Sequence, residues 1–164
     1  MSGQDAFSNL IRSYEYHREQ ILILSRQIRI RMREYDNELY NLLKTVSGIG
    51  PLTSSALITE FGDINRFPHI NHLSSFVGSV PRVKQSGEIS YNGGMTFHCN
   101  KCLRTLLIES YWQAIRQDPA LMQYYHQHVI NNKGQKVIVK VARKLLNRIR
   151  YVMKTRQSYV TGVA

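Results

Sequence analysis

Residues 5–46 contain neither proline nor glycine, the two residues that interrupt helices most strongly. Positions 10, 14, 17, 21, 24, 28, 31, 35, 38 and 42 advance by alternating steps of four and three, and seven of these ten are apolar or aromatic. This spacing predicts a long helix of the coiled-coil type. Residues 28–33 alternate with period two, as a strand would. The helical pattern continues on both sides without a breaker, so residues 1–44 are predicted to be a coiled-coil or dimerisation helix.

An amphipathic helix of this length requires a partner for its apolar stripe. We expect the helix to pair with its copy in a second subunit, which would make the protein a homo-oligomer. The alternative is that the stripe packs along the helix's own domain.

A glycine-rich turn follows, between two stretches with helical spacing. Gly48 and Gly50 permit positive φ and close backbone approach, and Pro51 suits the first turn of an outgoing helix. We predict a helix-hairpin-helix element over residues 45–61. Its free N–H groups at a helix N-terminus would hold a phosphate oxygen, with nucleic-acid contacts at Gly48, Ile49, Gly50 and Thr53. The alternative is a tight helix connection that binds nothing.

The positive charge of the chain is concentrated toward its C-terminus. The formal net charge is +11, and after Asp118 the sequence contains no acidic residue but nine lysines and arginines. This distribution favours a polyanionic partner. A basic amphipathic helix is predicted over about residues 135–156, and its basic face is expected to include Arg150. Nucleic-acid contacts are predicted on this face at Lys136, Lys140, Arg143 and Lys144. The alternative is a basic face that is merely solvated.

Helical spacing disappears between residues 80 and 95, where we expect an ordered loop or an irregular hairpin. Ser86 precedes Gly87, which would let a substrate approach, and Arg82 and Lys84, just before it, are predicted nucleic-acid contacts. A serine beside cations could attack a phosphodiester. A simple Ser-Gly turn is the alternative.

The rest of the chain has the spacing of further helices, over about 99–117 and 119–130, with Lys101 and Arg104 in the first turns of the former as predicted nucleic-acid contacts. The fold class is therefore mainly α, with one domain over residues 45–156 and a tail over 157–164. No apolar run reaches the ~18 residues that span a bilayer, and no signal peptide is evident, so we expect a cytoplasmic protein without a membrane partner.

The two cysteines, Cys99 and Cys102, have the spacing of half a zinc site. Zinc would need two more ligands, for which His126 and His128 could be nominated. Because only two cysteines are present and they lie at a predicted helix start, we expect thiols and no metal site.

Seven sequence blocks, in order and spacing, resemble the C-terminal half of the insertion-sequence transposases of the IS-one-ten family, which are guided by a bridge RNA. The resemblance covers about residues 40–154. The blocks are Leu-x-x-Val-x-Gly-Ile-Gly-Pro-Leu-Thr from Leu43, Glu-Phe-Gly-Asp-Ile-x-Arg-Phe-Pro from Glu60, Leu-x-x-Phe-x-Gly-x-x-Pro from Leu73, Gln-Ser-Gly-Glu from Gln85, Leu-Arg-x-Leu-Leu-Ile-Glu from Leu103, Ile-Arg-x-Asp-Pro-Ala-Leu from Ile115, and Ala-Arg-Lys-Leu-Leu-Asn-Arg-Ile-Arg from Ala142.

The resemblance implies DNA recombination. Members of this family have an N-terminal RuvC-like domain, whose four acidic residues hold Mg²⁺, and a C-terminal transposase domain with a nucleophilic serine. By motif match that serine is Ser86, which would attack a DNA phosphate and release a 3′ hydroxyl. DNA and the structured guide RNA would lie against basic surfaces of a dimeric or tetrameric assembly.

The sequence also departs from the family pattern. We expect no RuvC-like domain in this chain, so no cofactor is expected in it and Mg²⁺ would come from the missing domain. Where the family usually has Gly-Asn-Lys, the chain has Cys99-Asn100-Lys101-Cys102. The alternative function is a non-catalytic nucleic-acid-binding and dimerisation module, the relic of a truncated transposase.

Overall fold

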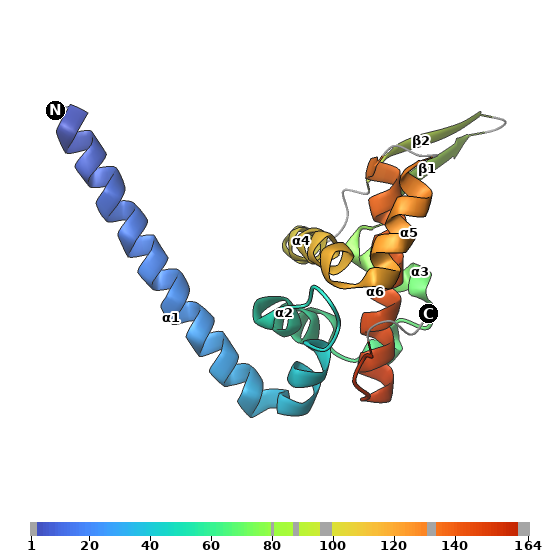
Figure 1. The fold of residues 1–164 in the computed structure, drawn as a ribbon, viewed down its shortest axis with the longest axis horizontal. Coiled ribbons are helices and arrows are strands. Elements are labelled where there is room, and N and C mark those ends of the chain that lie inside the picture. Colours follow the sequence, from blue (N-terminus) through green and yellow to red (C-terminus); the bar gives the residue numbers. More distant parts are fainter. Residues whose placement is uncertain (1–2, 80, 87–88, 96–99, 131–133, 161–164) are drawn as a thin grey trace.

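The computed structural model describes residues 3–79, 81–86, 89–95, 100–130 and 134–160, with side chains omitted for 81–86, 89–95 and 134–136. The described chain is mainly helical, which confirms the predicted fold class. Figure 1 shows one long helix extending away from a body of shorter helices, and a two-stranded ribbon projecting from the opposite side of that body. None of the described helices combines the length and apolar content needed to cross a bilayer.

Several helices begin or end at the prolines and glycines of the sequence. Pro51 and Pro119 each open a helix, and Gly62 and Gly78 each follow the last residue of one. The elements are α1 (Gly3–Leu43), α2 (Pro51–Phe61), the 3-10 turn η1 (Ile64–Arg66), α3 (Ile70–Val77), β1 (Pro81–Ser86), β2 (Ile89–Met95), α4 (Lys101–Gln117), α5 (Pro119–Val129) and α6 (Gly134–Thr155).

Only the C-terminal end of α1 packs on the body. Leu39, Tyr40 and Leu43 are buried there. Upstream, the predicted apolar stripe is open to solvent: Leu10 is 69% exposed and Ile21 is 63% exposed. The alternative in which the stripe packs along its own domain is therefore wrong for residues 10–21, whereas Leu24, Ile28 and Met32 line a hollow shared with α2 and α4.

A kink that the sequence did not predict lies at Asp36. This residue has non-helical torsions (φ −156°, ψ 81°), and its carboxylate accepts a hydrogen bond from the N–H of Leu39 (2.9 Å), as a helix-capping residue does. The same carboxylate forms an ion pair of 2.8 Å with Arg156, which follows α6 and has a positive φ of 55°. Past Arg156, the N–H of Tyr159 donates to the Thr45 hydroxyl (2.8 Å). The C-terminal segment thus ties the end of α6 to the base of α1.

Helix α6 forms the centre of the body. It contacts α1, η1, α3, α4 and α5, and one side of it is buried over its whole described length. Its buried residues are Val137, Val141, Ala142, Leu145, Leu146, Ile149, Val152 and Met153. Because a single helix contributes to so many interfaces, the burial of its apolar side supplies much of the hydrophobic stabilisation of the domain.

An aromatic cluster joins α2, η1 and α3. The rings of Phe61, Phe67 and Phe76 lie 5.2–6.1 Å apart between centroids. The Arg66 guanidinium lies over Phe67 and Phe76, and it donates to the Glu60 carbonyl (2.7 Å). Arg66 is thus used to hold these elements together.

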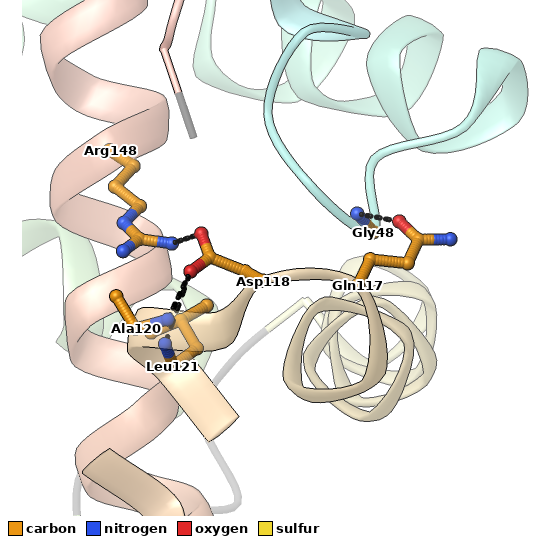
Figure 2. A network of polar contacts seen from close by, with 6 residues as sticks. All are labelled: Gly48, Gln117, Asp118, Ala120, Leu121 and Arg148. Atoms are coloured by element: carbon orange, nitrogen blue, oxygen red, sulfur yellow. Dashed lines mark hydrogen bonds and ion pairs between the residues drawn. The ribbon is translucent and has the colours of Figure 1, made fainter. Parts of the chain in front are cut away.

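The corner between α4 and α5 is held by a buried charge. Asp118 is fully buried, and its Oδ1 accepts from the N–H groups of Ala120 (2.9 Å) and Leu121 (3.2 Å) at the start of α5. Its Oδ2 pairs with the guanidinium of Arg148 on α6 (Figure 2). One carboxylate therefore caps α5 and binds α5 to α6.

The region predicted to be a loop or irregular hairpin is an antiparallel two-stranded ribbon. Ser86 pairs with Ile89 at its end, and Arg82 pairs with Gly93. The register shifts between Pro81 and Arg82, so that β2 has one extra residue at this point, as in a β-bulge. The irregular hairpin is thus confirmed.

Replacing Asp118 with alanine should be strongly destabilising, because it leaves the Arg148 charge without its partner and α5 without its cap. We expect the free energy of unfolding, measured by urea denaturation, to fall by about 3–5 kcal/mol. Asp63→Ala is the matched control, since Asp63 caps only the exposed turn η1 (2.9 Å to the Asn65 N–H). That control should cost about 1 kcal/mol. Equal losses in the two variants would contradict the role assigned to the buried pair.

Candidate nucleic-acid interface

The connection between α1 and α2 lines a small hollow at the surface. Its volume is about 410 Å³, and one wall is formed by two glutamines of α4. We call it the hairpin hollow, and it is lined by Lys44, Thr45, Val46, Ser47, Gly48, Ile49, Gly50, Gln113 and Gln117.

Gly48 fixes the turn against α4. Its φ is +82°, and an added Cβ would lie 2.3 Å from the carbonyl oxygen of Ser110 and 2.7 Å from the backbone nitrogen of Ala114. The Gly48 N–H donates to the side-chain oxygen of Gln117 (2.9 Å), as Figure 2 shows. No other residue type combines this φ with so close a backbone approach.

The expectation that the turn leaves its N–H groups free is correct only in part. It is wrong for Gly48, which donates to Gln117, and for Ile49, which donates to the Val46 carbonyl (3.0 Å). At the start of α2, by contrast, the N–H groups of Gly50, Leu52 and Thr53 donate to no acceptor in the described part of the chain. The available N–H donors therefore lie at the N-terminus of α2, from Gly50 to Thr53.

Two predicted contact residues turn their side chains into the protein. Ile49 is 5% exposed and belongs to the core. Thr53 is also buried, and its hydroxyl lies 3.4 Å from that of Ser110 on α4. Both residues can offer only their backbone to a ligand, and the Ile49 N–H is already used.

Sequence reasoning missed the side chains that complete the hollow. The Lys44 ammonium lies 4.7 Å from the centre of the buried Tyr40 ring, which positions it beside the turn. Lys44 could have been found as the last cation before the glycines. Gln113 and Gln117 gave no signal in the sequence, because an amide on a helix has no characteristic spacing.

The predicted basic face of α6 is present on three of its four residues. Lys140, Arg143 and Lys144 are exposed. Arg143 donates to the Asn71 side chain (2.6 Å), and the Lys144 ammonium lies 3.9 Å from the centre of the Tyr124 ring. Lys136 is in α6, but its side chain is outside the described residues.

Two other arginines of α6 have structural roles. Arg148 pairs with Asp118, and Arg150 donates to the carbonyl oxygens of Phe67 and Pro68. The expectation that Arg150 adds to the basic surface is therefore wrong, because its charge is used to bind the chain between η1 and α3.

The start of α4 presents further positive charge. Lys101 is exposed in the first turn and Arg104 is partly buried in the next. Asn100 caps the helix by accepting from the N–H of Leu103 (3.0 Å). Because Asn100 caps α4, Lys101 and Arg104 lie in its N-terminal turns, the part of α4 that is closest in sequence to the ribbon.

Ser86 is the last residue of β1, and Arg82 and Lys84 occupy alternate positions before it. Their side chains are outside the described residues, so the nucleophile remains a prediction. In Figure 1 the ribbon projects from the body on the side away from α1. The structure therefore does not bring Ser86 together with the hairpin hollow within one chain.

No three histidine, cysteine, aspartate or glutamate side chains come together as a metal site among the described residues. Cys102 is an exposed free thiol, whereas Cys99 falls outside the described chain.

Tyr111 is the most strongly perturbed titratable group that the structure describes. Burial raises its pKa above the ordinary value, and the Ser79 hydroxyl lies 3.3 Å from its own. The phenol is 2% exposed. It stays protonated and cannot reach a phosphate, so it is not a nucleophile for DNA.

Residues 40–126 match the family described as "Transposase IS116/IS110/IS902 family". This stretch begins at the buried end of α1 and includes the hairpin hollow, the ribbon, α4 and most of α5.

Similar proteins come from several bacteria. The transposase for insertion sequence element IS1328 of Yersinia enterocolitica is 29% identical over 90% of this chain and 45% of its own length. The transposase for element IS1111A of Coxiella burnetii is 38% identical over 44% of this chain and 20% of its own length. The pilin gene-inverting protein of Moraxella bovis is 32% identical over 67% of this chain and 35% of its own length. The chain thus spans less than half the length of each of these relatives.

The contacts of Gly48 predict a sharp difference between the two glycines of the turn. Gly48→Ala should lower the free energy of unfolding by about 2–4 kcal/mol, because the turn must move off α4. Gly50 has a φ of −91° and an added Cβ would meet nothing within 4 Å, so Gly50→Ala should cost under about 1 kcal/mol. Thermal and urea unfolding of both variants measure this difference. A Gly48→Ala protein as stable as Gly50→Ala would show that the turn is not held against α4.

Proposed function

The chain belongs to the IS116/IS110/IS902 transposase family, and from this premise we propose that it is the part of a DNA transposase that binds DNA and a structured guide RNA and supplies Ser86 as nucleophile. The observation that supports nucleic-acid binding most is the hairpin hollow, where the Gly50 backbone and a positioned cation, Lys44, meet.

A phosphate group fits the chemistry of the hollow. The Gly50 N–H is available at the hollow, and those of Leu52 and Thr53 are available in the adjoining first turn of α2, where the helix dipole adds positive potential. Lys44 supplies a full positive charge, and Gln113 supplies an amide that can donate. None of these groups reads a base, so the hollow would position a nucleic-acid backbone without selecting its sequence.

The cations of α6 form a second contact surface. Lys140, Arg143 and Lys144 lie on a helix in the part of the chain that contains no acid. Arg143 and Lys144 are each oriented by a neighbour, Asn71 and Tyr124 respectively, and remain exposed. Such a surface suits phosphates of DNA or of a guide RNA, and it would make binding strongly dependent on salt.

In the proposed reaction the Ser86 hydroxyl oxygen forms a bond to a DNA phosphorus. The bond between that phosphorus and the 3′ oxygen breaks, and the leaving oxygen takes up a proton while the serine loses one. The product is a phosphoserine linkage that conserves the energy of the phosphodiester for rejoining. The match of Gln85-Ser86-Gly87-Glu88 to the family pattern supports this assignment.

Magnesium is not assigned to this chain. The described residues contain no cluster of carboxylates, histidines or cysteines suited to it. We propose that the metal is bound by a RuvC-like domain outside this sequence.

Helix α1 is proposed to bind a second copy of itself. Its stripe at Leu10, Tyr14, Ile21 and Leu24 follows the four–three spacing and is 54–69% exposed at each position. Burying such a stripe between two helices is the usual solution to this exposure. A homo-oligomer would also place two Ser86 residues in one assembly.

Ser86→Ala tests the catalytic part of the proposal. The chain is mixed with the RuvC-like domain of a relative, a guide RNA and a nicked DNA substrate that traps the intermediate. We expect a denaturation-resistant protein–DNA adduct that disappears in Ser86→Ala and persists in the matched control Ser90→Ala, on the facing strand. Adduct formation by Ser86→Ala would exclude this nucleophile. Salt-sensitive binding with no adduct in any variant would favour the non-catalytic module.

Ile21→Glu tests the oligomer. By light scattering at micromolar concentration we expect the unaltered chain to have about twice its 19.1 kDa mass or more, and Ile21→Glu to have the mass of one chain, because a charge would be buried in the seam. Ile23 is 43% exposed but lies off the stripe, so Ile23→Glu is the control and should retain the oligomer. A monomeric unaltered chain would contradict the proposal.

A further inference from the structure

A set of partly exposed rings lies where α4 meets α5. Trp112 of α4 is 40% exposed, and its ring centroid is 6.0 Å from that of Tyr125, edge to face. The Tyr125 centroid is in turn 5.9 Å from that of His126. We call Trp112, Tyr125 and His126 the aromatic surface. Rings that meet edge to face leave other faces open for contact.

The aromatic surface adjoins the hairpin hollow along α4. Gln113 and Gln117 line the hollow, and Trp112 and Arg116 each precede one of them by a single residue. One residue turns a helix by about 100°, so the two stripes are neighbours on the helix surface. The rings and the hollow therefore lie on adjoining sides of one helix, α4.

The two charges beside these rings lie at opposite ends of the stripe. Arg116 is exposed one helical turn after Trp112, and α5 contains no acidic residue. Glu109 is the acidic residue on the same stripe of α4, one turn before Trp112. The positive end of the stripe is therefore the one beside the hollow, where phosphates would lie.

We propose that the aromatic surface stacks the unpaired bases of a single-stranded segment whose phosphates are held at the hairpin hollow. The inference rests on the proposed function of the hollow, and it adds that the strand held there is not in a duplex. Aromatic rings beside a cationic backbone track are the usual means of binding single strands, since every base offers a π-face. Bases inside a duplex are already stacked on one another and offer no such face.

A protein partner is the competing occupant. Met122, which is 43% exposed on α5, is a residue type also common at protein interfaces. The adjacent hollow and the absence of acidic side chains from α5 favour a nucleic acid over a protein partner.

The first measurement uses the fluorescence of Trp112, the sole tryptophan of the chain. The full chain is titrated with a single-stranded oligonucleotide, with the duplex of the same sequence, and with an abasic strand of equal length. We expect quenching by the single strand alone, because stacking on a base quenches indole emission, and the abasic strand supplies phosphates without bases. Equal quenching by the abasic strand, or none by any strand, would overturn the proposal.

The second measurement compares variants by anisotropy of a labelled single strand. Trp112→Leu should weaken binding by about 5- to 100-fold, the expected loss of one base–aromatic stack, and Trp112→Phe should restore most of it. Tyr125→Leu should also weaken binding. Tyr16→Leu, at a 59% exposed ring of α1 outside the four–three stripe, is the matched control and should change nothing. Circular dichroism confirms that each variant is folded.

Lys44→Ala distinguishes failure of this inference from failure of the proposed function. If Lys44→Ala weakens binding and lowers the salt dependence by about one charge while Trp112→Leu changes nothing, the hollow binds phosphates and the stacking inference is wrong. If the unaltered chain binds neither strand nor duplex, the proposed function itself fails. Loss in both variants, with quenching by bases, supports both.

Discussion

Two adjacent side chains at the α4–α5 corner determine how the functional surfaces are placed. Gln117 accepts from the Gly48 N–H and so holds the turn, while Asp118 caps α5 and pairs with Arg148 of α6. The hairpin hollow, the aromatic surface and the basic helix are therefore positioned by one short segment, whose hydrogen bonds and ion pair Figure 2 shows. The buried carboxylate is costly to desolvate, and its three partners offset that cost only when all the elements are in place.

Many of the helix ends could be predicted from the positions of proline and glycine in the sequence. Pro51, Gly62, Gly78 and Pro119 mark helix ends because their backbone preferences act locally, whatever the rest of the chain does. The family resemblance is confirmed, and it located the turn and the ribbon in order. Serine chemistry, guide RNA and the oligomer stay predictions.

What could not be predicted depends on contacts between distant residues. Whether an arginine of α6 faces solvent or a buried acceptor is decided by the partner, so Arg148 and Arg150 looked like surface cations until α5 and η1 were placed beside them. The Gly48 N–H looked free because its acceptor, Gln117, is 69 residues away. The kink at Asp36 has the same origin, since its other partner follows α6.

The ion pair between Asp36 and Arg156 lies at the kink of α1, so a small change of angle there produces a large displacement at the N-terminal end of the helix. The helix ahead of the kink, residues 3–35, is about 50 Å long at ~1.5 Å per residue. A change of about 10° at Asp36 would therefore displace the far tip by roughly 9 Å, more than the spacing of two neighbouring phosphates. The position of any partner bound near that tip therefore depends on the 2.8 Å ion pair between Arg156 and Asp36. The C-terminal segment, whose Tyr159 N–H also donates to Thr45 at the hairpin hollow, thus contacts both the base of α1 and one wall of the proposed phosphate site.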